Sequence, residues 1–118
     1  MEVRFGVRSR FAKGVRPARA MTKLEADFEL LLESKKRRGE IRDYKYEALT
    51  LKLGPDCRYT PDFMVMESDD TIAFYETKGP FARDDGMVKL RVASEQFPFR
   101  FFLCKRPRGE DWTITPVG

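Results

Sequence analysis

The sequence predicts an α/β domain in which one helix, three strands, a second helix and a further strand follow one another. Two observations predict the helices: residues 22–38 carry apolar side chains at helical spacing, and residues 84–96 carry a weaker apolar pattern that ends before Pro98. A third observation predicts the strands, because apolar stretches separated by turn signals fill the segment 46–78. Since strands and helices are interleaved, we expect a mixed sheet with helices packed against it.

Residues 1–20 are predicted to form a basic arm that precedes the domain. They contain Gly6, Gly14 and Pro17 and show no sustained apolar period. Against the single acid Glu2, this stretch carries six cations: Arg4, Arg8, Arg10, Lys13, Arg16 and Arg19. The remaining residues, 21–118, have the length of one domain.

The first helix is expected from Thr22 to about Arg38. Thr22 and Glu25 have the spacing of a capping box, and Gly39 suits the left-handed position after a helix end. At about 100° per residue, one apolar stripe follows the helix, formed by Met21, Leu24, Phe28, Leu31 and Leu32. Glu25 borders this stripe and therefore faces the sheet, whereas Glu29 projects further toward solvent.

Three strands are expected next, at 46–53, 58–66 and 71–78. The first ends at the turn signal Gly54-Pro55-Asp56. The polar connection 67–70 joins the second and third strands, so these two are expected to form an antiparallel hairpin.

The C-terminal part is expected to add a helix and two strands. The helix runs from about Asp84 to Gln96, with Asp84 and Asp85 able to cap it and Pro98 ending it. Residues 99–104 are typical of a buried strand, and residues 112–117 of a short edge strand.

Composition limits the chemistry, because the chain contains no histidine. This excludes Ser-His-Asp and Cys-His catalysis, His-ligated zinc, and nucleases that use a histidine as general base. Cys57 and Cys104 lack CxxC spacing and are expected to be reduced, buried thiols. Any catalysis must therefore use carboxylates, lysine, tyrosine or a hard cation bound by oxygen.

Carboxylates and a lysine are expected to converge at one end of the central hairpin. Glu76 and Lys78 continue the strand face that begins with Ile72 and Phe74. On the preceding strand, Asp62 follows Pro61, and the hairpin can place it opposite the Glu76–Lys78 end.

Two nearby buried carboxylates repel each other unless a divalent cation neutralises both. Magnesium fits such a site, because it takes one or two carboxylates and keeps waters for a substrate phosphate. A bound ion of this kind lowers the pKa of a water and stabilises charge on a phosphate under attack. Lys78 can orient that water or hold a phosphate oxygen.

The positive charge of the chain favours a nucleic-acid partner. The formal net charge is +4, and besides the arm, cations gather at residues 35–38 and 105–108. Such runs bind phosphate backbones by releasing counterions. The expected DNA-binding residues are Arg8, Arg10, Lys13 and Arg16 in the arm and Lys89 on the second helix.

No stretch reaches the roughly 18 consecutive apolar residues of a membrane span. The basic N-terminus also lacks the apolar core of a signal peptide. We therefore expect a protein of the cytoplasm that has no membrane partner.

Two motifs carry a resemblance to a known group of enzymes. Thr60-Pro61-Asp62-Phe63 and Tyr75-Glu76-Thr77-Lys78-Gly79 resemble the PD-(D/E)XK nuclease signature, with Glu76 fourteen residues after Asp62. Together with the helix and Gly39-Glu40-Ile41, they are similar to small phage-encoded endonucleases that resemble the endonuclease I type of Holliday-junction resolvase. The likeness spans roughly residues 20–105.

The resemblance implies a restriction-endonuclease-like core and Mg²⁺- or Mn²⁺-dependent hydrolysis of DNA, in the cytoplasm of a phage-infected or bacterial host. It implies a metal site of Asp62, Glu76 and the backbone carbonyl of Thr77, completed by a glutamate of the first helix. We expect Glu25 in that place, with Glu29 as the alternative, and the number of ions stays open.

A homodimer that cuts branched DNA is implied by the resemblance alone. A nicking, restriction-type or repair nuclease of the same fold would carry the same motifs. A DNA-binding module that keeps the fold without catalysis is a third reading, which the presence of all four expected site residues disfavours. These four are Glu25, Asp62, Glu76 and Lys78.

Overall fold

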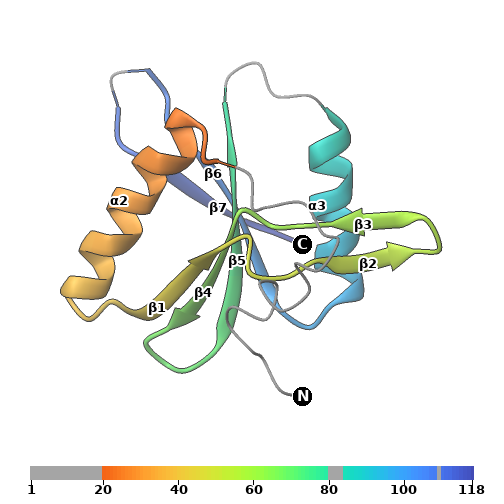
Figure 1. Cartoon of the computed structure of the whole chain (residues 1–118), viewed down its shortest axis with the longest axis horizontal. Helices are drawn as coiled ribbons and strands as arrows, with labels where there is room; N and C mark the ends of the chain where they lie inside the picture. The colour runs from red at the N-terminus through yellow and green to blue at the C-terminus, as the bar shows by residue number, and fades with distance from the viewer. Residues whose placement is uncertain (1–19, 80–83, 109) are drawn as a thin grey trace.

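In the computed structural model, which describes residues 20–79, 84–108 and 110–118, helices pack on both faces of a five-stranded sheet (Figure 1). The arm predicted at 1–20 lies outside these residues except for its last one. Along the chain the elements are α2 (Lys23–Arg37), β1 (Ile41–Tyr46), β2 (Leu51–Gly54), β3 (Cys57–Tyr59), β4 (Phe63–Glu67), β5 (Ile72–Lys78), α3 (Asp84–Gln96), β6 (Arg100–Lys105) and β7 (Thr113–Val117).

The large sheet is mixed, as the sequence predicts. Its strand order is β1-β4-β5-β6-β7, and a separate two-stranded sheet is formed by β2 and β3. Strands β5 and β6 are parallel because α3 connects them, whereas the other neighbours pair antiparallel. The α/β class is therefore confirmed.

Both helices lie close to their predicted positions. The capping box of α2 is present: Thr22 Oγ1 accepts from Glu25 N at 3.1 Å, and Glu25 Oε1 accepts from Thr22 N at 2.8 Å. Gly39 follows the helix with a φ of +78°, which a residue without Cβ adopts at little cost. Within the described residues, neither helix has the length and hydropathy needed to cross a membrane.

Two strand predictions were wrong because a hairpin interrupts the main sheet. The segment 46–53 is not one strand: β1 ends at Tyr46, and Glu47 turns the chain with a φ of +45°. The segment 58–66 also divides, since β3 ends at Tyr59 and β4 begins only at Phe63. Apolar alternation continues across both breaks because the inserted β2–β3 hairpin buries its own apolar face against α3.

Two apolar clusters lie on opposite faces of the sheet, as strand alternation requires. On the α2 side, Phe28 and Leu32 pack against Phe63 and Tyr75. On the α3 side, the cluster contains residues of β4, β5, α3, β6 and the hairpin, among them Met64, Phe74, Leu90, Ala93, Phe101 and Tyr59. Strand β5 is therefore covered on both faces.

The start of each helix lies near the C-terminal end of β5. A Cβ added to Gly79, just after β5, would lie 3.9 Å from Leu24 Cδ2 in the first turn of α2. A Cβ added to Gly86, in the first turn of α3, would overlap Nζ of Lys78. The first turns of α2 and α3 therefore both lie close to the residues that end β5.

Candidate active site

The β4–β5 pairing brings the two predicted strand carboxylates together. Phe63 pairs with Tyr75, so Asp62 and Glu76 are the next residues outward in the same register. Asp62 N donates to Glu76 Oε1 at 3.2 Å, and Thr77 N donates to Asp62 Oδ2 at 2.9 Å. Each acid therefore accepts a hydrogen bond from a backbone amide of the segment that carries the other acid.

Hydroxyl groups from three different elements hold one oxygen of each acid. Thr77 Oγ1 donates to Asp62 Oδ2 at 2.8 Å, and Tyr59 donates to Glu76 Oε1 at 2.8 Å. Tyr46 donates to Glu25 Oε1 at 2.9 Å. The second oxygen of Glu76, Oε2, lies 3.5 Å from Lys78 Nζ, so it faces the ammonium group.

Sequence reasoning missed the two tyrosines. Tyr59 is three positions before Asp62, and in one continuous strand it would point to the opposite face. It reaches Glu76 only because the chain breaks between β3 and β4. Tyr46 carried no signal either, because the pattern of residues 46–53 predicts that it begins a strand, whereas in the structure it ends β1.

The three acids are buried, and this raises the pKa of the strand pair. Asp62 is 5 % exposed and Glu76 is 8 % exposed. Burial and the negative charge of Glu76 raise the pKa of Asp62 to about 7, while hydrogen bonds from Thr77 oppose the shift. Burial also raises the pKa of Glu76, against the hydrogen bond from Tyr59 and the charge of Lys78.

Burial and the charge of Glu76 also raise the pKa of Tyr59, which keeps this hydroxyl protonated as a donor. Cys104, opposite Thr77 on β6, is fully buried and its thiol pKa is raised by burial and by the charges of Asp62 and Glu76. It is a free thiol, as predicted; Cys57 is also free but only partly buried.

The lysine is held between β5 and α3. The side chain of Lys78 is 15 % exposed and forms its ion pair with Glu76, whose side chain is 10 % exposed. Its Nζ occupies the space next to Gly86 that a Cβ would fill, and a Cβ there would also lie 3.3 Å from Lys78 Cε. The missing side chain of Gly86 therefore makes room for the ammonium group.

Of the two candidate helix acids, Glu25 is the better placed. It is 5 % exposed, and its negative charge contributes to the raised pKa of Asp62. Glu29 lies one turn further along α2, where its charge acts on Tyr44. Lys89 is exposed on α3, and the predicted arm contacts lie outside the described residues.

Among the described residues, no three Asp, Glu or Cys side chains are close enough to hold an ion together. Asp62 and Glu76 form a pair, with Glu25 within electrostatic reach. Such a pair of oxygen ligands fits Mg²⁺, which accepts one or two carboxylates and fills its remaining positions with water. It does not resemble the usual zinc sites, because the sequence has no histidine and only two cysteines.

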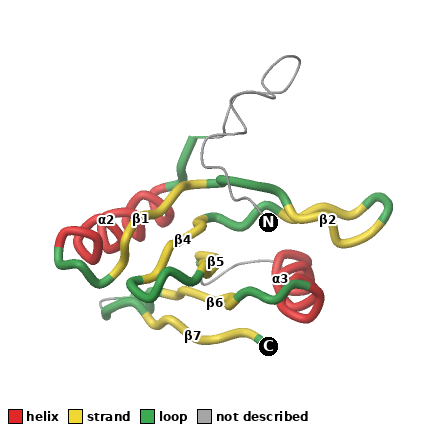
Figure 2. Tube along the Cα trace, turned by 90° about the horizontal axis from the view of Figure 1, so that it is seen from below, coloured by secondary structure: helices red, strands yellow, loops and turns green. Residues whose placement is uncertain are grey.

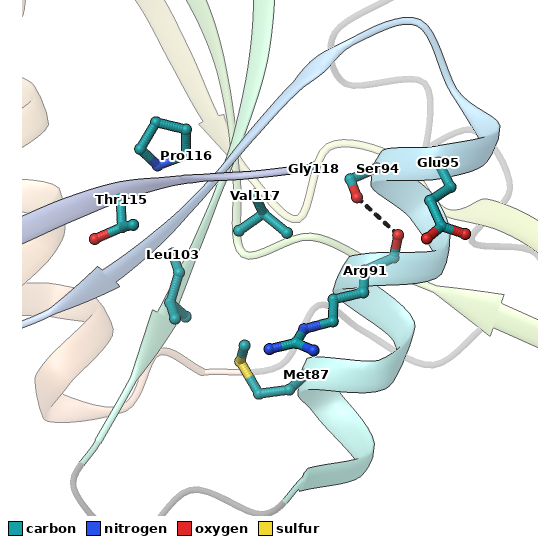
Figure 3. Close-up of a pocket in the computed structure, with 9 residues that line it drawn as sticks. All are labelled: Met87, Arg91, Ser94, Glu95, Leu103, Thr115, Pro116, Val117 and Gly118. Carbon is teal, nitrogen blue, oxygen red and sulfur yellow. Dashed lines mark hydrogen bonds between the residues drawn. The ribbon is translucent and has the colours of Figure 1, made fainter.

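A pocket of about 350 Å³ lies elsewhere, between α3 and the strands β6 and β7 (Figure 3). Met87, Leu103 and Val117 line its apolar part, with Arg91 beside them. None of the acids of the candidate site lines this pocket. It is therefore a separate feature of the molecule.

The chemistry that this site can perform follows from its charges. The buried pair of Asp62 and Glu76 carries one ammonium group beside it, on Glu76, so a hard cation could be held by the two acids. Comparisons with protein-family models, curated proteins and solved structures give no match for this chain. The site's own geometry is thus the basis for a functional assignment.

Proposed function

We propose that the protein is a metal-dependent DNA endonuclease that hydrolyses phosphodiester bonds. The observation that carries the proposal is the buried pair of Asp62 and Glu76 with Lys78 beside it. Burying two like charges is costly unless something neutralises them. One lysine leaves an excess of negative charge, and a divalent cation would remove it.

The roles of the residues follow from their positions. Asp62 and Glu76 would hold Mg²⁺ or Mn²⁺, and Glu25 would add negative charge from α2. When bound, the ion supplies a water of lowered pKa and stabilises charge on the phosphate. Lys78 carries a fixed positive charge that can hold a phosphate oxygen. In the reaction, water adds to phosphorus while one P–O ester bond breaks, and the leaving oxygen takes up a proton.

DNA is the proposed substrate because cations outnumber acids, 23 to 19, and cluster along the chain. The order helix, three main-sheet strands, helix and strand supports a restriction-endonuclease-like core, with β2 and β3 as an insertion. Selectivity for branched DNA and a homodimer rest on the resemblance of the Pro-Asp and Glu-x-Lys motifs alone.

The test is a cleavage assay on junction, linear duplex and supercoiled DNA with Mg²⁺, Mn²⁺, Ca²⁺ or EDTA. Cleavage should require Mg²⁺ or Mn²⁺ and fall at least 100-fold in Glu76→Gln and Lys78→Met, since each removes a charge at the reacting centre (~3 kcal/mol). Lys45→Met is the matched control, because Lys45 is an exposed lysine on β1 that lies outside the predicted DNA-binding runs.

Binding of DNA without cleavage in any divalent ion would instead identify a binding module. Cleavage of RNA alone would refute DNA as the substrate. Equal loss of activity in Lys45→Met would show that general basicity, and not the position of Lys78, is what matters.

A further inference from the structure

The β2–β3 hairpin has one apolar face that fixes it to the domain. Leu51 and Tyr59 are buried against α3, and Gln96 Nε2 donates to the backbone oxygen of Leu53 at 3.1 Å. The hairpin extends past α3, away from the main sheet (Figures 1 and 2). Its position is therefore defined by packing along one side.

The other face of the hairpin carries two positive charges that no acid of the described residues neutralises. Lys52 pairs directly with Arg58 across the two strands, and both are exposed. Like charges in this arrangement destabilise a sheet. Neither has an ionic partner within the part of the chain that the structure describes, whereas Arg42 pairs with Asp70. A negatively charged ligand on this face would relieve the repulsion.

The basic pair lies close in sequence to a residue that contacts the candidate active site. Arg58 immediately precedes Tyr59, whose hydroxyl donates to Glu76. Consecutive Cα atoms are about 3.8 Å apart, and one nucleotide rises about 3.4 Å along duplex DNA. The Arg58 side chain points to the face opposite Tyr59, and its backbone is the next residue along from one that contacts Glu76, on a support that packing keeps in place.

We infer that Lys52 and Arg58 form a contact for the DNA phosphate backbone that flanks the cleaved bond. The inference rests on the proposed function, which supplies DNA as the partner. A polyanion neutralises both cations at once, so binding removes the repulsion that the free protein carries. The pair would set where the strand lies but would not read its sequence, because phosphate contacts carry no base information.

The test compares two double variants with the same change in net charge. Lys52→Gln/Arg58→Gln removes the hairpin pair, and Arg42→Gln/Arg100→Gln removes two cations near the β4–β5 turn, at the opposite end of β5. Binding to a short duplex is measured by fluorescence anisotropy with Ca²⁺ and with EDTA, from low to moderate salt. Thermal unfolding of both variants is measured without DNA.

The hairpin variant should reduce the slope of log K against log salt by about one unit for each cation removed. It should also unfold about 1–4 °C higher than the parent protein, since the repulsion is gone. The control variant should keep the parent slope and unfold at a lower temperature, because it loses its pairs with Asp70 and Asp69.

An unchanged slope in the hairpin variant would overturn the inference while leaving cleavage of DNA untouched. A lower unfolding temperature would also overturn it, because the pair would then be part of the fold. If the protein binds duplex DNA through the hairpin but never cleaves it, the proposed catalytic function fails and this contact remains. If the hairpin variant weakened the binding of RNA but not of DNA, DNA would be refuted as the partner.

Discussion

Asp62 shows how the burial of a single charged side chain can oppose folding. Its pKa is raised from 3.8 to about 7, so the folded chain binds the proton more tightly than the unfolded chain does. The stability of the ion-free protein should therefore fall as pH rises from about 4 to 7. Above pH 7 the full penalty of this buried charge is present.

Asp62→Asn should accordingly stabilise the ion-free protein at pH 8, by on the order of 2 kcal/mol. An amide oxygen can still accept the two hydrogen bonds from Thr77, while the charge next to Glu76 is removed. Denaturant unfolding in EDTA at pH 8 and pH 4 measures the effect, which should shrink at pH 4.

Asp56→Asn, at the exposed tip of the hairpin, is the control and should change the free energy of unfolding little at either pH. Added Mg²⁺ should raise the unfolding temperature of the parent protein but not that of Asp62→Asn. A destabilised Asp62→Asn variant at pH 8 would contradict this account of the acid pair.

Gly86 controls the place of Lys78 although it has no side chain. Gly86→Ala should stabilise α3 by roughly 0.5–1 kcal/mol, because alanine favours the helix. The new Cβ would displace the lysine Nζ, which is the mobile end of a flexible side chain. Under the proposed function, kcat should fall by about tenfold or more while KM for DNA stays near the parent value.

The control for this variant is Val88→Ala, on the same helix. Val88 is 58 % exposed, so its replacement improves helix propensity without a contact to Lys78. Unfolding temperature and kcat are measured for both variants. Full activity in Gly86→Ala would show that the position of the ammonium group does not limit the reaction.

At the scale of elements, local signals predicted those parts of the fold whose start and end are set by nearby residues. The ends of α2 were predicted by the capping box of Thr22 and Glu25 and by the glycine at position 39. The observed α3 has the predicted bounds. Strand β5 was predicted within one residue, and the hairpin pairing predicted that Asp62 would meet Glu76.

The insertion could not be predicted because its breaks leave the apolar alternation intact. Glu47 adopts a positive φ that its residue type does not predict. Its N–H donates at 2.8 Å to the backbone oxygen of Asp62, which is 15 positions away in the sequence. Pro61 was consistent with a strand start, which is close to where β4 begins. Residues separated by these breaks, such as Tyr59 and Glu76, meet through long-range packing that no local pattern encodes.

The hairpin contributes to the candidate site through one hydroxyl group. Tyr59→Phe should lower stability by about 1 kcal/mol, because Glu76 Oε1 loses a buried donor. If Tyr59 orients the acid for Mg²⁺, the affinity for the ion should fall by about 10–100-fold. Calorimetric titration of Mg²⁺, together with denaturant unfolding, measures both effects.

Leu51→Ala provides the comparison, since it loosens the same hairpin but keeps the hydroxyl. It should cost about 2 kcal/mol or more of stability and change the affinity for Mg²⁺ less than Tyr59→Phe does. If both variants change the affinity equally, the hairpin acts by general packing and the hydroxyl has no separate role.

At the scale of the whole molecule, the proposed activity predicts the number of subunits that cleavage requires. Symmetric cutting of two strands requires two copies of the site, and one chain provides one. Mixing the parent protein with Glu76→Gln chains, refolded together, should therefore yield dimers that nick one strand of a junction and leave the other intact.

A matched mixture with Glu95→Gln, which changes an exposed acid on α3, should leave symmetric cutting unaffected. Gel analysis of junction products, with sedimentation of the same samples, separates these outcomes. A single-chain mass in sedimentation at assay concentrations would remove the dimer from the proposal.

The N-terminal cap of α2 is linked to the charge state of the acids. Glu25 uses one oxygen, Oε1, for both the Thr22 amide and the Tyr46 hydroxyl, and the same carboxylate acts on Asp62. An ion that draws Glu25 inward must compete with the Thr22 amide for that oxygen. Ion binding would then weaken the N-terminal cap of α2. Faster deuterium uptake at the Thr22 amide would report this weakening before any bond is cut.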